Sequence, residues 1–244
     1  MRYARGVYRS LDPDKITETA RLLASRIVER FPGSSLSKLA AELHAEAKTA
    51  AETSHWLAAP RRWVRALTLA AIVLILVAAG ATFFALNRSA ALFSSVADFL
   101  QGLDALVNEV VLIGVAIFFL VSLETRIKRT RALKAIHTLR SMAHIIDMHQ
   151  LTKDPERLTG PREDTPSSPQ RRMTAFELAR YLDYCSEMLA IISKEAALHV
   201  QNFRDPVTLA AVDEVQDLTT GLSQKIWQKI MILERVGPSS TTSA

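Results

Sequence analysis

One stretch of this sequence limits its possible folds more than any other. The 21 residues from Ala66 to Leu86 contain no charged side chain. Because an α-helix rises about 1.5 Å per residue, this run spans roughly 31 Å, which is the thickness of the hydrocarbon core of a bilayer. The sequence therefore predicts a membrane-spanning helix here, with boundaries at residues 63 and 86.

A second apolar run is shorter. Val110 to Leu123 gives 14 uninterrupted apolar residues, or roughly 21 Å of helix, so length alone also allows a buried core helix. Extension back to Val107 gives 17 residues, with Asn108 and Glu109 at the level of the headgroups, and a basic segment follows at once. We interpret residues 107–123 as a second span.

The basic residues near the two runs predict the orientation. Arginines precede the first run, six basic residues follow the second between Arg126 and Arg140, and the connection between the runs holds only Arg88. Since Lys and Arg near span ends stay in the cytoplasm, both termini are expected inside. The high Ala and Arg content is compatible with a bacterial inner membrane. The first apolar run begins too late in the chain for a signal peptide, and the single Cys185 fits a reducing compartment.

Residues 87–106 form the short external connection in this topology. Its apolar residues fall on one helical face, which predicts either an amphipathic helix on the outer membrane surface or an outward extension of the second helix. These residues are Leu92, Phe93, Val96, Phe99, Leu100 and Leu103.

The remaining chain predicts cytoplasmic helices. Residues 1–60 form a helical hairpin, 124–151 a juxtamembrane helix, 152–173 a flexible linker with four prolines, 174–235 an antiparallel helix pair and 236–244 a disordered tail. The fold class is thus an all-α membrane protein, with two transmembrane helices and a cytoplasmic antiparallel helical bundle. The bundle should contain three helices, to which the N-terminal hairpin could add.

The helix pair has the most regular pattern in the chain. A T-x-x-E capping box at Thr174 opens the first helix, and apolar positions then recur at alternating spacings of four and three. This seam comprises Leu178, Leu182, Cys185, Leu189, Ile192, Ala196, His199 and Phe203. The second helix starts at Pro206 and carries Leu218, Trp227, Ile230 and Met231 beside its own seam, so a third helix should cover them.

The juxtamembrane segment is expected to bind anionic lipid headgroups. Each basic residue near the surface contributes about 1 kcal/mol to such binding. The expected contacts are Arg126, Lys128, Arg129, Arg131 and Lys134. A nucleic-acid partner is not expected, because the basic run adjoins a span and has no interleaved aromatic residues.

Three histidines, at positions 137, 144 and 149, suggest a possible metal or proton-handling site. His137 and His144 are about 10.5 Å apart along one helix, which is too far to share an ion. His144 and Asp147 form the one local pair, and a metal would need further ligands from Cys185 or His199, with Glu195 one turn before His199. No complete catalytic or metal motif is present, so a structural role is favoured and no cofactor is expected.

These patterns support a non-enzymatic two-pass membrane protein whose bundle mediates self-assembly or recruits a protein partner. A first alternative is a subunit of an oligomeric channel or transport complex, for which Thr68, Thr82, Ser122 and Glu109 are the candidate polar residues. A second is a membrane-bound metal enzyme or a pH sensor that uses the His144/Asp147 region. Protonation of His199 in a helix interface could also loosen the bundle.

Overall fold

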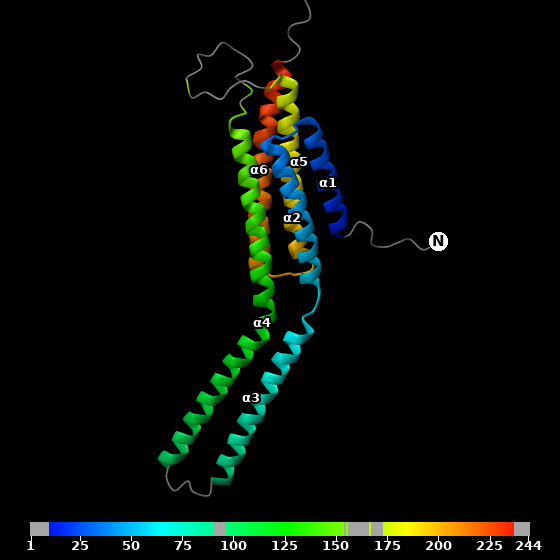
Figure 1. Cartoon of the computed structure of the whole chain (residues 1–244). Coiled ribbons are helices and arrows are strands. Elements are labelled where there is room, and N and C mark those ends of the chain that lie inside the picture. Colours follow the sequence, from blue (N-terminus) through cyan, green and yellow to red (C-terminus); the bar gives the residue numbers. More distant parts are fainter. Residues whose placement is uncertain (1–9, 90–95, 154, 156–165, 167–172, 237–244) are drawn as a thin grey trace, which may run out of the picture. The chain divides into compact units, whose positions relative to one another are not determined.

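The computed structural model describes residues 10–89, 96–153, 155, 166 and 173–236. The described residues form helices and no strand, which confirms the all-helical prediction (Figure 1). The helices are α1 (Pro13–Arg30), α2 (Ser35–Ala58), α3 (Arg62–Ser89), α4 (Val96–Leu151), α5 (Ala175–Gln201) and α6 (Pro206–Val236). The chain divides into two compact units, one of residues 1–58 and 131–244 and the other of residues 59–130.

The N-terminal hairpin has the turn chemistry that its sequence predicts. Asp12 caps α1 by accepting hydrogen bonds from the backbone N–H groups of Asp14 and Lys15, and Pro13 occupies the first helical turn, where its missing N–H costs nothing. Gly33 adopts a φ of +68°, which favours glycine in the turn between α1 and α2. The Ser34 hydroxyl then accepts from the N–H of Ser37. The two helices therefore fold back on each other.

The α5–α6 pair is capped at the start of each helix. Thr174 and Glu177 form the expected capping box of α5. Asp205 accepts hydrogen bonds from both the backbone N–H and the hydroxyl of Thr208 at the start of α6. Because only residues 202–205 join the two helices, they pack side by side and antiparallel (Figure 1).

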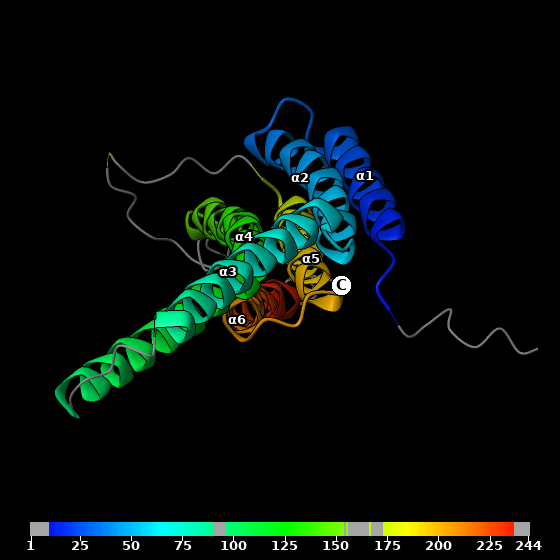
Figure 2. The same cartoon turned by 90° about the horizontal axis from the view of Figure 1, so that it is seen from below.

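The core of the larger unit surrounds α5. Figure 2 shows α5 between α2 and α6, and both α1 and α2 pack against it. The end of α4 from Arg131 onward contributes buried residues to the same core. The N-terminal hairpin is thus part of the bundle, which contains five helical segments. All seam residues of α5 from Leu178 to His199 are buried, as the spacing predicts.

The smaller unit contains α3 and the first part of α4. These two helices are long and apolar enough to cross a membrane, and the residues of their most apolar windows are not buried within the protein. Apolar side chains left uncovered on this scale need an apolar surrounding.

Helix α4 is longer than the predicted second span. It runs unbroken for 56 residues from Val96 to Leu151, and no proline interrupts this stretch. From Val96 onward, the connection that the sequence predicts to be external therefore continues the second apolar helix, which was one of the two alternatives. Leu92 and Phe93 lie outside the described residues, as do most of the predicted linker 152–173 and tail 236–244.

Candidate functional site

Of the predicted His144/Asp147 pair, Asp147 takes part in a link between α4 and α6. Asp147 Oδ1 accepts a hydrogen bond of 2.6 Å from Gln150 Nε2. The Lys229 ammonium on α6 donates to the backbone oxygen of Gln150 at 2.8 Å and to its Oε1 at 2.6 Å. His144 itself is exposed. Asp147 therefore orients a side chain that holds two helices together.

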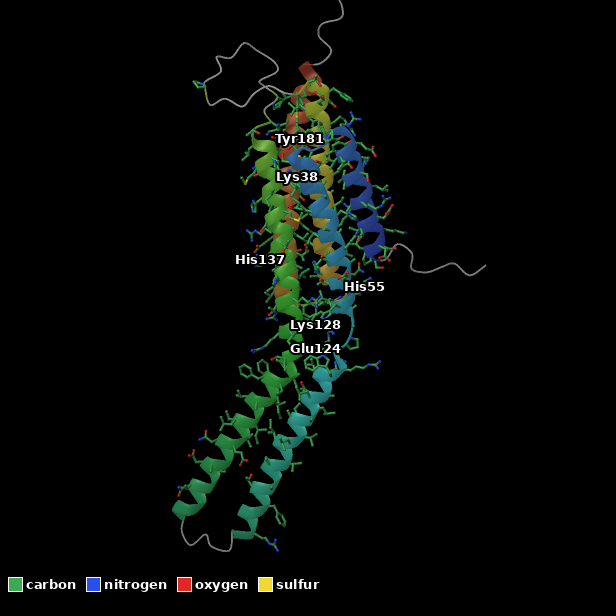
Figure 3. All side chains as sticks on the ribbon, in the orientation of Figure 1. Lys38, His55, Glu124, Lys128, His137 and Tyr181 are labelled. Atoms are coloured by element: carbon green, nitrogen blue, oxygen red, sulfur yellow. The ribbon has the colours of Figure 1, made fainter. Side chains whose placement is uncertain are left out.

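The candidate metal ligands are not brought together. Exposed His144 lies on α4, whereas Cys185 and His199 are buried on α5, so the expectation that His144 faces either of them does not match the structure. Within the described parts of the chain, no group of three or more His, Cys, Asp and Glu side chains is arranged to hold a metal ion. His137 is exposed on the side of α4 (Figure 3).

Cys185 has the environment of a packing residue. Its side chain is fully buried, and burial raises the pKa of its thiol to about 12. A nucleophilic cysteine requires access and a lowered pKa, because the thiolate is the reactive form. Cys185 is therefore chemically inert in the closed bundle.

Glu195 and His199 are the most unusual ionisable groups in the described core. They lie one helical turn apart on α5, and both have 0% relative exposure. Burial raises the pKa of Glu195 to about 9, with a smaller contribution from the carboxylate of Glu46 on α2, and burial lowers the pKa of His199 to about 4. Near neutral pH the carboxyl is protonated and the imidazole is neutral.

The burial of Glu195 was not evident in the heptad seam. Glu195 lies beside the seam, on the part of α5 that a three-helix bundle leaves open. The N-terminal hairpin covers this part, and the Ser54 hydroxyl on α2 donates to the backbone oxygen of Leu198 at 3.2 Å. The available signal was the Glu-x-x-x-His spacing, which places Glu195 and His199 on one helix face.

Glu124 forms the centre of an ionic cluster in the smaller unit. Its carboxylate accepts hydrogen bonds from Arg65 Nε at 2.7 Å and from the Arg61 backbone N–H at 3.2 Å, and it pairs with Lys128 Nζ at 3.1 Å (Figure 3). These donors, with that of Arg65 first, lower the pKa of Glu124 to about 2. The sequence predicts for Glu124 only that it begins the juxtamembrane helix 124–151.

Lys128, one of the residues expected to bind lipid headgroups, belongs to this ionic cluster. Lys128 has a relative exposure of only 8%, and its ammonium pairs with Glu124 one turn earlier on α4, so little of its charge is accessible for the predicted contact with lipid headgroups. Arg126 lies over the Phe119 ring and Arg131 over the Trp56 ring, and both remain exposed with Lys134. Arg129 is partly buried.

A groove between α5 and α6 provides a candidate docking surface. It has a volume of about 460 Å³ and is bordered at one end by Trp227, whose relative exposure is 61%. We call this the Trp227 groove. Longer side chains, those of Leu189, Lys194 and Gln224, also line it. The remaining lining residues are small and leave space between the two helices; these are Ser186, Ala190, Ser193, Thr219, Thr220 and Ser223. Leu218 and Ile230 are partly buried against the core, whereas Trp227 is exposed, so the expectation that Trp227 is covered is not met.

Polar side chains also link the two apolar helices. The Thr68 hydroxyl on α3 donates a hydrogen bond of 3.5 Å to the backbone oxygen of Leu120 on α4. Thr82 on α3 donates a hydrogen bond of 3.1 Å to Glu109 Oε1 on α4, and also one of 2.8 Å to the backbone oxygen of Ala79. Two of the polar residues considered for a channel are therefore bonded to each other.

Comparisons with known proteins found no relative of this chain. No family model matches the chain, and neither a curated protein nor a solved structure is similar to it.

Proposed function

We propose that this chain is a non-enzymatic, two-pass membrane protein whose cytoplasmic helical bundle assembles with a second copy of itself. The observation that carries the proposal is the exposed Trp227 beside the Trp227 groove. A large side chain and a depression on the same surface make that surface suited to symmetric pairing, because a two-fold axis places each side chain against the partner's depression. Trp is also among the residues that most often dominate binding energy at interfaces.

The apolar helices support the membrane part of the proposal. The uncovered side chains of α3 and of the first part of α4 are suited to lipid, and the basic residues beside them favour a cytoplasmic bundle. Recruitment of a different protein through the same groove is the second form of the proposal.

Removing the exposed side chain and filling the depression should both weaken assembly. We expect Trp227→Ala and Ala190→Trp each to weaken self-association of the full chain in nanodiscs by at least about tenfold, since a central aromatic residue commonly contributes 2 kcal/mol or more. Light scattering and crosslinking measure the oligomeric state. Phe176→Ala, an equally exposed aromatic position on α5 outside the groove, serves as the control.

The outcomes separate the two forms of the proposal. A wild-type chain that stays monomeric at all concentrations excludes self-assembly. Recruitment then requires a protein that crosslinks in native membranes to the wild type and to Phe176→Ala but not to Trp227→Ala. Crosslinking that is equal for all variants contradicts both forms.

A further inference from the structure

The buried pair Glu195 and His199 has no hydrogen-bond partner among the residues that the structure describes. Neither carboxylate oxygen of Glu195 and neither ring nitrogen of His199 makes a hydrogen bond. Buried polar groups are nearly always hydrogen-bonded, because an unpaired group loses its hydration without compensation. Two such groups one turn apart on the same helix keep the core intact only while both are uncharged.

Among the described residues, no cation contributes to the shifted pKa of Glu195 or of His199. On α2, Glu46 places a like charge near Glu195. On α1, the Thr17 hydroxyl donates to backbone oxygens, and on α6 the Asp205 carboxylate is bonded to Thr208. On α4, the guanidinium of Arg131 lies over the Trp56 ring. Ionised Glu195 would therefore be buried with a carboxylate nearby and without a hydrogen-bond donor.

We propose that Glu195 and His199 form a proton-controlled latch between α5 and the α1–α2 hairpin, closed while both side chains are uncharged and opened when either one ionises. Opening would expose the face of α5 that α1 and α2 cover. This face is separate from the Trp227 groove, so the latch does not depend on the proposed self-assembly.

Rising pH ionises Glu195, whereas falling pH ionises His199. Glu195 has a pKa raised from 4.5 to about 9, so its stabilising contribution is complete below pH 4.5 and is lost as pH rises toward 9. His199 has a pKa lowered from 6.5 to about 4, so its contribution is complete above pH 6.5 and is lost as pH falls toward 4. The latch should be tightest between these limits, at mildly acidic pH.

Hydrogen exchange of the full chain in nanodiscs tests the alkaline side. From about pH 6.5 to 8.5, we expect the opening constant of the α1, α2 and α5 amides to rise by up to tenfold per pH unit in the wild type relative to Glu195→Gln. The ratio of the exchange rates of the two proteins at each pH is independent of the intrinsic pH dependence of exchange, because this dependence is the same in both. Glu52→Gln removes an exposed carboxylate from α2 and should leave the ratio to wild type constant.

The variant His199→Met tests the acidic side of the latch. Below about pH 6.5 and down to pH 4, the ratio of wild-type to His199→Met opening should rise by up to tenfold per pH unit, because only the wild type gains a proton on opening at that position. His137→Met, at an exposed position of α4, should give a constant ratio.

Two results would overturn the latch. One is a wild-type to Glu195→Gln ratio that is constant between pH 6.5 and 8.5. The other is an equal change in α6, since that would indicate general unfolding of the bundle and not release of the hairpin. Glu195→Met gives the same test if the glutamine variant does not fold, because methionine has a similar length and does not titrate.

Discussion

At the scale of single residues, Glu124 and Glu195 show how the surroundings of a carboxylate decide its role. Both glutamates have a basic residue within two positions in the sequence. In the described structure, however, three donors contact the Glu124 carboxylate and none bonds to Glu195. Donors favour the charged form and lower the pKa, whereas burial alone favours the neutral form and raises it. One carboxylate is therefore held as an ion and the other as an acid.

Removing the charge of Glu124 should destabilise the smaller unit. Glu124→Gln leaves the Lys128 ammonium without its carboxylate, and leaving a partly buried charge without its partner costs about 2 kcal/mol. Thermal unfolding in detergent micelles measures the loss. The exposed pair Arg140–Glu214 gives a matched comparison, for which Glu214→Gln should cost no more than about 1 kcal/mol.

The double variant Glu124→Leu/Lys128→Leu distinguishes the cause. If the unpaired ammonium is responsible, removing both charges should cost less than removing Glu124 alone. A double variant that is less stable than Glu124→Gln would contradict this explanation.

At the scale of elements, local sequence signals account for where the helices begin. Asp12, Thr174 and Asp205 each cap a helix through a side-chain oxygen, and Asp and Thr directly before the first helical turn are typical signals of a helix start. The caps differ in burial, because Asp205 has only 3% relative exposure. A buried cap should matter more, since water cannot replace the lost acceptor.

The cap of α6 can be tested against that of α1. We expect Asp205→Ala to lower the stability of the bundle by about 2 kcal/mol and Asp12→Ala by about 1 kcal/mol or less, the upper and lower parts of the usual range for N-caps. Thermal unfolding gives the magnitudes, and hydrogen exchange of the first turn of α6 locates the effect. Equal losses in the two variants would show that burial of the cap is unimportant here.

At the scale of the whole molecule, the distribution of basic residues predicts the topology. The connection between α3 and α4 is poor in Lys and Arg, whereas both flanking segments are rich in them. The described helices are compatible with two crossings, because α3 and the first part of α4 are each long and apolar enough to span a bilayer.

Cysteine labelling of intact cells tests this topology. Because Cys185 is the single native cysteine and is buried, an added cysteine gives a clear signal. We expect an impermeant thiol reagent to label Asp104→Cys without permeabilisation, and to label exposed Ser25→Cys only after the membrane is opened. Labelling of Ser25→Cys in intact cells would place the bundle outside.

The sequence by itself determined the helical fold class, the two apolar helices, the helix caps and the buried seams of α5 and α6. These properties follow from local periodicity and from uncharged runs, which depend on residues close together in the chain. Only the tertiary structure decided that the N-terminal hairpin covers α5, that Trp227 stays exposed and that Glu124 on α4 accepts a hydrogen bond from Arg65 on α3. It also decided that Glu195 and His199, and not His144 and Asp147, are the buried ionisable pair. The reason is that burial and pairing depend on which distant helix covers a given face, and helix periodicity identifies a face without identifying its neighbour.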